Sequence, residues 1–268
     1  MENWMEKIDY GKGTGVENKS QYHIQCKKGD IAPIAIVPGD QGRVKRIIKF
    51  LENPTKIAEN RGLITYKGTY EGIPVSVTST GMGGPAAGIV YEELINLGAK
   101  ILIRIGSMAA IQPEINRGDI SIPMACVRDD GLTQYYVPQN YPAIADPILY
   151  NNLIKEGEKS NIQIHTGINW THSAFYSRSK DYFLQWTKKG VKTLEMEASA
   201  LFVIGMLRGV STAMIGTIYE NRFNQTEKND MDLSVKNIND QLIEKGVNAS
   251  IEIALKAAIS TYKQKWRN

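Results

Sequence analysis

The run KILIRIG at residues 100–106 constrains the fold more than any other stretch of this sequence. It is short and almost continuously apolar, which is typical of a strand covered on both faces in a parallel sheet. Other short apolar runs alternate along the chain with segments whose apolar residues have helical spacing. This alternation favours an α/β fold, so we expect a single domain with a central mixed β-sheet flanked by helices.

The individual elements follow from the same patterns. Strands are predicted at 31–39, twice within 64–80, and at 100–106, 118–130, 164–170, 191–196 and 211–220. Helices are predicted at 42–51, 85–97, 146–160, 197–209 and 248–266. In the second of these helices Pro85 suits the first turn, and Gly98 suits the C-terminal cap.

Length and the N-terminal composition set the domain boundaries. A chain of 268 residues can form one large core, so we expect a polar N-terminal arm at 1–20 and one domain at 21–268. The arm is charged and Gly-rich and has no apolar segment of the kind found in a signal peptide or membrane anchor. We therefore expect a soluble protein with a cytoplasmic location.

Charge and cysteine usage exclude several classes of partner. The formal net charge of +4 is mild, and no basic stripe interleaved with aromatic residues is present, so nucleic acid is not expected and a small anionic substrate fits better. Cys26 and Cys126 lie far apart without CxxC spacing, and there are three histidines. This pattern predicts no metal site and is consistent with a reducing compartment.

Two predicted strand ends carry basic residues that could bind an anion. In PGDQGRV, Gly39 allows a close backbone approach and Arg43 falls in the first turn of a helix, although a solvated surface arginine would look the same. In RIGSMA, Arg104 lies within an apolar strand and therefore needs an anionic partner, with Ser107 close by. A structural ion pair is the alternative for Arg104.

Of two further predicted strand ends, one is rich in glycine and the other carries two acids. STGMGGPAAG is not a GxGxxG loop and has no suitable acid about twenty residues later, so its glycines favour close packing or a small ligand rather than a dinucleotide. In TLEMEASALF, Glu195 and Glu197 flank Met196 in apparent strand register. An acid in the first turn of a helix complements its dipole, whereas two carboxylates on one face suit a pair of sugar hydroxyls.

Taken together, ordered motifs over about residues 21–222 resemble the nucleoside phosphorylase family, and within it the uridine phosphorylases. The motifs are YHIQCKKGDIAPIAIVPGDQGRV, ENRGLITYKGTY, TSTGMGGPAAGIVYEELINLGAKILIRIGSMAAIQPEINRGD, VRDDG, YPAIAD, SAFY, LEMEASALF and ENR. Several motifs in the same order are harder to produce by chance than one. The resemblance implies phosphorolysis of a nucleoside, with uridine favoured, to a free base and a (deoxy)ribose 1-phosphate.

The resemblance also implies roles for particular residues. The phosphate site would comprise Gly39, Arg43, Arg104, Ser107 and, from a neighbouring subunit, Arg61. The ribose site would comprise Glu195, Met196, Glu197 and, from the same neighbour, His23. The base would contact Phe175, Arg178 and Tyr219. Inorganic phosphate would be the co-substrate without any cofactor or metal, and the assembly would be at least a dimer, with a hexamer usual in the family.

Some positions depart from the family pattern. The Gln-x-Arg pair that reads uracil is replaced by Ser179 and Asp181, and Arg178 or Gln185 could substitute for it. Gly62 stands where a potassium-binding Glu is found in bacterial uridine phosphorylases, so no potassium is expected. Ala109 replaces a glycine and would narrow the pocket.

Glu220 is compatible with an alternative class of substrate, the purine nucleosides. It falls where purine phosphorylases carry an Asp that protonates the leaving base, so it could be a general acid, or it could simply pair with Arg222. The alternatives are therefore a purine nucleoside or methylthioadenosine phosphorylase, then a hydrolytic nucleosidase, then a nucleoside-binding protein without catalysis. The residues alone leave base specificity and the choice between ribose and deoxyribose open.

Overall fold

The computed structural model describes residues 20–177, 179–223 and 241–266, and the expected arm at 1–20 therefore lies almost entirely outside the described residues. Its strands are β1 (Ile34–Ile36), β2 (Glu52–Asn60), β3 (Leu63–Tyr70), β4 (Ile73–Thr78), β5 (Ile101–Ala110), β6 (Ile120–Asp129), β7 (Ala143–Ile144), β8 (Ile164–His172), β9 (Thr193–Glu195) and β10 (Ser211–Asn221). The α-helices are α2 (Gln41–Ile47), α3 (Gly84–Asn96), α4 (Pro147–Glu158), α5 (Lys180–Thr187), α6 (Ala198–Arg208) and α7 (Gln241–Trp266).

The strands form one mixed sheet that closes on itself at one end. Its order is β10-β6-β8-β9-β5-β1-β4-β3-β2, and an additional parallel pairing of β10 with β5 completes a ring of five strands. The open part of the sheet extends from β5 through β1 to the antiparallel β2–β3 edge. The expected mixed α/β architecture is confirmed, but the sequence patterns did not reveal the closure, because it depends on which strands pair.

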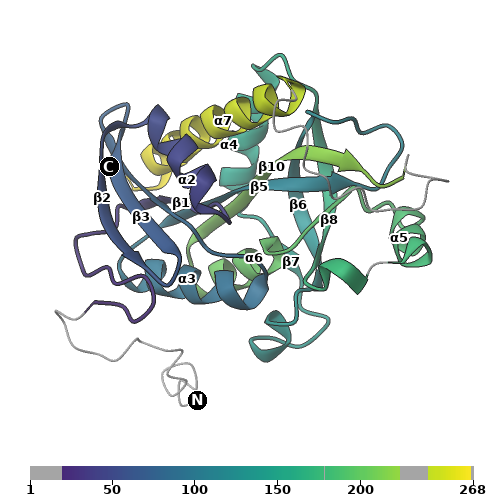
Figure 1. The fold of residues 1–268 in the computed structure, drawn as a ribbon, viewed down its shortest axis with the longest axis horizontal. Helices are drawn as coiled ribbons and strands as arrows, with labels where there is room; N and C mark the ends of the chain where they lie inside the picture. Colours follow the sequence, from purple (N-terminus) through teal and green to yellow (C-terminus); the bar gives the residue numbers. More distant parts are fainter. Residues whose placement is uncertain (1–19, 178, 224–240, 267–268) are drawn as a thin grey trace.

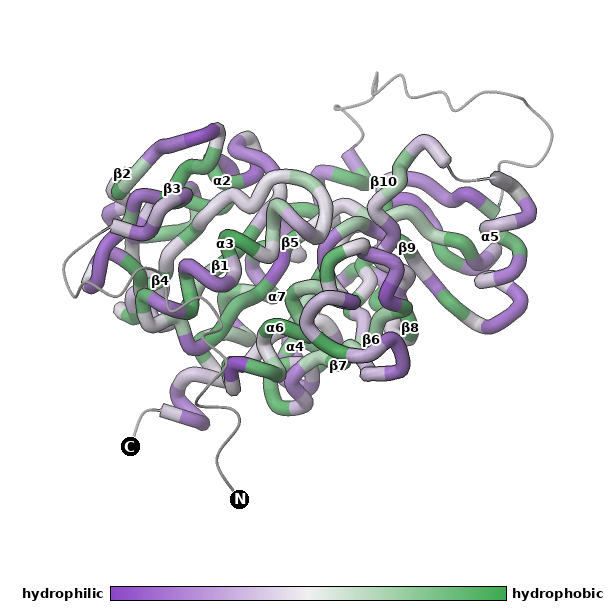
Figure 2. Tube along the Cα trace, turned by 90° about the horizontal axis from the view of Figure 1, so that it is seen from below, coloured by the Kyte–Doolittle hydropathy of each residue, from purple (hydrophilic) through white to green (hydrophobic). Residues whose placement is uncertain are grey.

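Helices cover both sides of these strands. Figure 1 shows α4 and α7 on one side and α3 and α6 on the other, and α4 packs against α7 while α3 packs against α6. The apolar residues of these elements form one large core, including Ile103 of β5 and Phe202 of α6, both fully buried. Hydrophilic stretches lie at the periphery, notably along the β2–β3 hairpin (Figure 2).

A second, smaller core lies under α5. Trp170 of β8 is fully buried there with Ile111, Val191 and Leu194, and Tyr182, Phe183 and Trp186 of α5 pack against it. The helix was not among the predicted elements. Its sequence, KDYFLQWT, mixes aromatic and polar residues without a long apolar stripe. This small core holds α5 beside the end of β8.

Two other local predictions need correction. The helix expected at 42–51 ends as an α-helix at Ile47 and continues as a 3₁₀ turn over Ile48–Phe50. After Leu51, the nine residues Glu52–Asn60 form β2, which the sequence analysis did not predict. Its residues are mostly exposed because it is an edge strand that pairs on one side only, with β3, so it lacks the apolar pattern of the inner strands.

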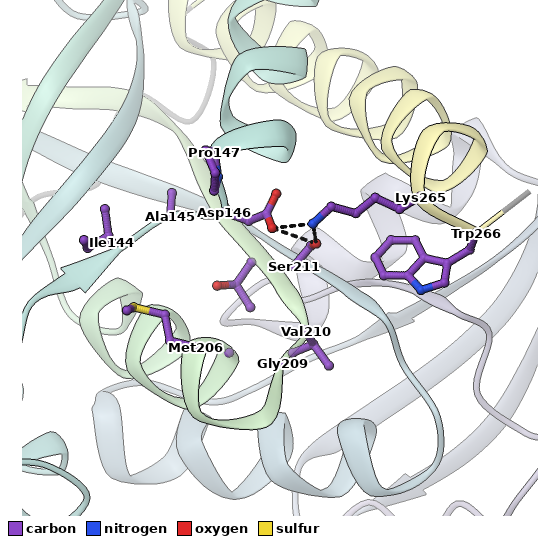
Figure 3. Close-up of a pocket in the computed structure, with 12 residues that line it drawn as sticks. Ile144, Ala145, Asp146, Pro147, Met206, Gly209, Val210, Ser211, Lys265 and Trp266 are labelled. Carbon is purple, nitrogen blue, oxygen red and sulfur yellow. Dashed lines mark hydrogen bonds and ion pairs between the residues drawn. The ribbon is translucent and has the colours of Figure 1, made fainter.

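The C-terminal helix is fastened at the amino end of β10. Lys265 Nζ lies 2.5 Å from Asp146 Oδ2 and 2.7 Å from Ser211 Oγ, beside a cavity of about 500 Å³ (Figure 3). Burial acts to raise the pKa of Asp146, but hydrogen bonds from Lys265 and the α4 backbone hold it below its usual value. The lysine, the aspartate and the serine are hydrogen-bonded to one another, so we interpret this cluster as a structural anchor for α7.

Candidate active site

A pocket of about 560 Å³ lies at the opposite ends of the strands. It is lined by residues from the carboxyl ends of β5, β9 and β10 and from the turn after β1, the edge where open α/β sheets bind ligands. The structure brings together most of the predicted site residues here, namely Gly39, Arg43, Arg104, Ser107, Phe175, Glu195, Met196, Glu197, Tyr219 and Glu220. Met82, Met108, Ala109 and Tyr176 also line it.

Arg104 of β5 is the charged centre of the pocket and is only 5% exposed. Its Nε donates to Glu195 Oε2 at 3.1 Å, and its Nη2 forms an ion pair with Glu197 Oε2. Burial acts to lower the pKa of Arg104, but the two carboxylates, Glu197 above all, outweigh it and raise the pKa. The guanidinium therefore stays charged, and the structural ion pair that the sequence analysis gave as the alternative for Arg104 is present.

The remaining nitrogen of Arg104 forms no hydrogen bond, although the buried Tyr91 hydroxyl, which also forms none, interacts with the same guanidinium. Nη1 is buried and makes no hydrogen bond to any described residue. It lies beside Gly39, where an added Cβ would be 3.8 Å from Nη1 and 3.4 Å from the Gly81 carbonyl oxygen. A buried charged donor without an acceptor is costly, so this nitrogen marks a place for an anion or another acceptor at the pocket wall.

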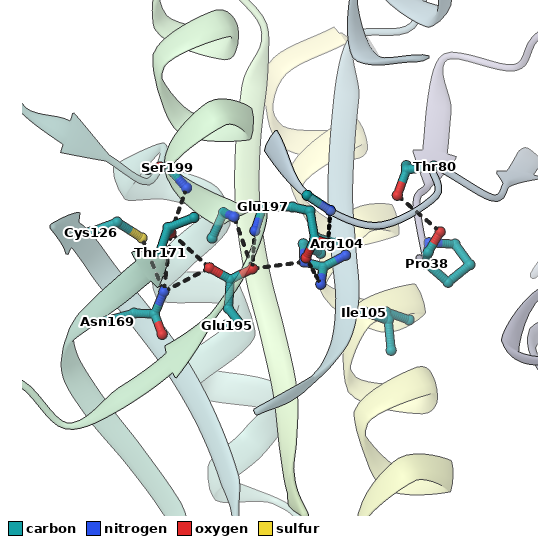
Figure 4. A network of polar contacts seen from close by, with 12 residues as sticks. Pro38, Thr80, Arg104, Ile105, Cys126, Asn169, Thr171, Glu195, Glu197 and Ser199 are labelled. Atoms are coloured by element: carbon teal, nitrogen blue, oxygen red, sulfur yellow. Dashed lines mark hydrogen bonds and ion pairs between the residues drawn. The ribbon is translucent and has the colours of Figure 1, made fainter. Parts of the chain in front are cut away.

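Glu195 is held on all sides, as Figure 4 shows. Its Oε1 accepts hydrogen bonds from Asn169 Nδ2 at 2.9 Å and Thr171 Oγ1 at 2.7 Å. Its Oε2 accepts from Arg104 Nε and from the backbone N–H groups of Glu197 and Ala198. With five donors around it, this carboxylate fixes the guanidinium and the first turn of α6.

Glu197 does not share the strand of Glu195. β9 ends at Glu195, and Glu197 is the N-cap of α6, which corrects the expected common strand register. Its Oε1 accepts from the Gly83 backbone N–H at 2.6 Å, and its Oε2 faces Arg104. Burial raises the pKa of Glu197, Arg104 opposes that shift, and Glu195 adds to it. The two acids thus meet at one arginine from different directions.

The glycine-rich loop before α3 explains this contact. Gly83 has φ of 87°, a conformation that favours glycine, and it presents its N–H to the buried carboxylate. Gly81, with φ of 74°, donates its N–H to the Gly39 carbonyl at 2.9 Å. The loop therefore joins the two turns that frame the pocket, in agreement with its interpretation as a close-packing loop.

Arg43 supplies a second positive charge. It lies in the first turn of α2, whose N-cap Asp40 accepts a hydrogen bond from the Arg43 backbone N–H at 2.8 Å. Its guanidinium Nη1 is 3.4 Å from the Ile105 carbonyl oxygen and 3.5 Å from Asp40 Oδ2. Because the Asp40 side chain is 57% exposed, its attraction is weakened by solvent and leaves Arg43 able to face an anion.

The end of the pocket where the base is expected is formed by aromatic residues and one acid. Phe175 and Tyr176 belong to a short 3₁₀ turn, and Tyr219 and Glu220 belong to the end of β10. Arg222 contacts Glu220 Oε1 through Nε at 2.8 Å and through Nη2 at 2.7 Å. The expected ion pair is therefore present, and Glu220 lines the pocket as well. Arg178 lies outside the described residues.

Two predicted residues do not line this pocket. His23 Nδ1 is 2.7 Å from Glu93 Oε1, and the Asn60 side chain donates to the His23 carbonyl at 2.8 Å. Arg61 lies at the β2–β3 turn, where it contacts the Tyr22 hydroxyl at 3.3 Å. His23 and Arg61 thus share a surface region separate from the pocket of their own chain.

Asn169 and Thr171 were missed by the sequence analysis. Both are fully buried on β8, and both support Glu195. Their spacing of two residues places them on one face of the strand, which was the available signal, but their partner lies on a strand far along the chain. Among the described residues no cluster of three or more potential metal ligands occurs, and no described helix is long and apolar enough to span a membrane.

Comparison with known proteins identifies the family. The family model described as the phosphorylase superfamily matches residues 33–258. The chain belongs to this superfamily. It is 36% identical over 231 residues to a uridine phosphorylase of Thermococcus kodakarensis, a match that covers 81% of this chain and 83% of that protein.

Solved structures agree. The uridine phosphorylase of Vibrio fischeri matches with a TM-score of 0.83 and 31% identity over 90% of this chain and 98% of that one. A purine nucleoside phosphorylase of Toxoplasma gondii in complex with immucillin-H also matches with a TM-score of 0.83, at 28% identity over 94% of this chain and 99% of that one. The expected resemblance to nucleoside phosphorylases, and to uridine phosphorylases in particular, is confirmed.

Proposed function

We propose that this member of the phosphorylase superfamily is a pentosyltransferase that cleaves a nucleoside, with uridine favoured, using inorganic phosphate. The products are the free base and a pentose 1-phosphate. One observation carries the proposal: a buried arginine, fixed by two carboxylates, keeps one nitrogen unpaired at the wall of the pocket. The uridine phosphorylases among its relatives support the same reaction.

The phosphate would lie between Arg104 and Arg43. Nη1 of Arg104 and the Arg43 guanidinium supply positive charge, Gly39 leaves room for the anion, and Ser107 adds a hydroxyl from the same strand as Arg104. Because Glu195 and the β5 strand fix the guanidinium beforehand, little reorganisation is needed when the phosphate binds. No other cofactor is required for this chemistry.

The sugar would lie over the phosphate and beside Met196. Glu197 is the proposed acceptor for the ribose hydroxyls, since its Oε1 is oriented by the Gly83 N–H at the pocket wall. Glu195, expected near the ribose, already accepts five hydrogen bonds, so we assign it the positioning of Arg104.

Cleavage of the N-glycosidic bond builds positive charge on the sugar and negative charge on the leaving base. A phosphate dianion beneath the sugar stabilises the first charge and is the nucleophile that attacks C1′. The protein contributes mainly by positioning the two reactants and by supplying fixed charges. Phe175 would stack on the base, with Tyr219 and Arg178 near it.

A neighbouring subunit would complete the site with His23 and Arg61. Neither residue lines the pocket of its own chain, and the Asn60 amide joins the two segments that carry them. The proposed assembly is a homo-oligomer of at least two chains, a hexamer by analogy with the family, located in the cytoplasm. Mixing an Arg61→Ala protein with an Arg104→Ala protein should restore part of the activity if sites are shared, and no restoration would contradict sharing.

A purine nucleoside or methylthioadenosine is the second candidate substrate. Glu220 lines the base-binding end, and a carboxyl group there could donate a proton to a leaving purine. The similarity to a purine nucleoside phosphorylase is compatible with this alternative.

The deciding experiment is a panel of uridine, thymidine, inosine, adenosine and methylthioadenosine, each assayed for base release with and without phosphate. Fastest phosphate-dependent turnover of uridine is the expected result. Release of base without phosphate would indicate a hydrolytic nucleosidase. Binding without turnover would indicate a nucleoside-binding protein, and either result would refute phosphorolysis.

A further inference from the structure

One oxygen of Asp129 joins three elements behind the base-binding end. Asp129 ends β6, and its Oδ2 lies 2.7 Å from His172 Nδ1 and 3.2 Å from Trp170 Nε1 of β8. It also accepts a hydrogen bond from the Tyr182 hydroxyl of α5 at 3.0 Å. Three donors from two other elements therefore converge on one carboxylate oxygen, and none of them lines the pocket.

His172 continues this network toward the pocket. Its side chain is 8% exposed and packs against Trp170, with ring centroids 4.6 Å apart. Its Nε2 is 3.4 Å from Ser177 Oγ, and the same hydroxyl is 3.0 Å from the Ala174 carbonyl oxygen. The imidazole therefore bridges from a buried strand to the exposed turn Phe175–Ser177.

The order of acid, imidazole and hydroxyl resembles a nucleophilic triad, but the surroundings favour another role. Asp129 shares its oxygen with Trp170 and Tyr182, and the Ser177 hydroxyl donates to the Ala174 carbonyl just before the turn. Through Ser177, the network contacts the turn that places Phe175 at the pocket. A second tether lies alongside, where Ser173 Oγ donates to the Asp130 carbonyl at 2.8 Å.

We propose that Asp129 and His172 are positioning residues that hold the Phe175–Ser177 turn over the base and so set the affinity for the nucleoside. The inference rests on the function proposed above. Asp129 fixes the imidazole, the imidazole contacts Ser177, and the turn presents the Phe175 ring. Phosphate binds at the other end of the pocket and does not depend on this link.

The test compares four variants with the nucleoside that the wild type cleaves fastest. Ser177→Ala removes the last link at an exposed position, and His172→Asn keeps a donor for Asp129 but cannot reach Ser177. Each should raise the nucleoside KM about three- to tenfold, the size of one hydrogen bond, and leave the phosphate KM unchanged. The double variant should be no worse than either single variant, because both cut one chain of contacts. Ser177→Thr, which keeps the hydroxyl, should restore the wild-type KM.

Tyr182→Phe is the matched control. It removes a donor from the same Asp129 oxygen without cutting the link to Ser177, so its nucleoside KM should stay within about twofold of the wild type. The proposal is overturned if Ser177→Ala leaves the nucleoside KM unchanged, if nucleoside and phosphate KM rise together, or if Tyr182→Phe matches His172→Asn.

Failure of the positioning role can be distinguished from failure of the proposed function. A wild type that releases no base with phosphate would refute phosphorolysis. The dissociation constant of labelled uridine, measured for the same variants, would then test the positioning role by the same ratios.

Discussion

The two ends of the pocket are built differently. At the proposed sugar–phosphate end, Arg104, Glu195 and Glu197 are 5%, 4% and 3% exposed and are fixed by strands and by the start of α6. At the proposed base-binding end, Tyr176 is 77% exposed and belongs to a short turn. One end is built around buried charges, and the other around partly exposed aromatic side chains and one acid.

This difference separates the reaction from the choice of substrate. Buried charges must be paired and held, so the sugar–phosphate end tolerates little change without loss of both stability and reactivity. A turn at the surface can vary without disturbing the main core, which suits the part of a site that selects among bases. Ser179 and Asp181, which stand where the resemblance implies a Gln-x-Arg pair, lie at the start of α5, directly after this turn in the chain.

The largest effect should come from Arg104→Ala. We expect kcat to fall by roughly 10²- to 10³-fold, or about 2.7–4 kcal/mol, by analogy with loss of an oxyanion donor. The free energy of unfolding should also fall by about 3–5 kcal/mol, because two buried carboxylates lose their partner. Steady-state kinetics and urea unfolding measure the two effects.

Lys45→Ala, on the exposed side of α2, is the control for Arg104→Ala and should change stability by no more than about 0.5 kcal/mol. Wild-type turnover in Arg104→Ala would remove the basis for treating the buried end as the reactive one.

Glu197→Gln should lower kcat/KM by roughly 10- to 100-fold, because a charged acceptor for the sugar is lost. Its stability should also respond differently to pH. Burial raises the folded-state pKa of Glu197 above its ordinary value of 4.5, so above pH 4.5 the unfolded carboxyl ionises first and the wild type loses stability until pH passes the folded pKa.

Unfolding of the wild type and Glu197→Gln between pH 4 and 8 checks this sign. The wild type should become less stable relative to the variant as pH rises above 4.5, until the folded-state pKa is passed. A constant difference across the range would contradict a raised pKa.

Phe175→Ala should affect the base-binding end alone. Loss of ring stacking should raise the nucleoside KM by a factor that corresponds to about 1–3 kcal/mol, with the phosphate KM unchanged. Phe175→Tyr keeps an aromatic ring and should remain close to the wild type. An equal rise in both KM values would break the proposed independence of the two ends.

Glu220→Gln should have the smallest effect with uridine, for which we expect turnover within about twofold of the wild type. If the protein also accepts a purine nucleoside, the same variant should lose about 10²-fold in purine turnover, since general acid catalysis would be removed. Parallel assays with uridine and inosine distinguish the two cases. A large loss with uridine would show that Glu220 acts on pyrimidines too.

Local patterns predicted most of the inner elements. The apolar runs at β5 and β10 and the helical spacing of α3, α4 and α6 were readable because burial selects apolar residues regardless of partner. Edge strand β2 and the aromatic helix α5 were missed, since neither has a full apolar face toward the main core. The closed ring of strands was also beyond local patterns, because it requires β10 to pair with both β5 and β6.

For the site, the sequence by itself determined which chemical groups are available: an arginine in an apolar strand, paired acids at a strand end, and a glycine-rich turn. Only the tertiary structure decided how they combine. It directs Glu195 to Arg104, Asn169 and Thr171, and it leaves one guanidinium nitrogen unpaired beside Gly39. The reason is physical: the partner of a buried charge is set by which strands become neighbours, and that information lies in the packing of distant segments.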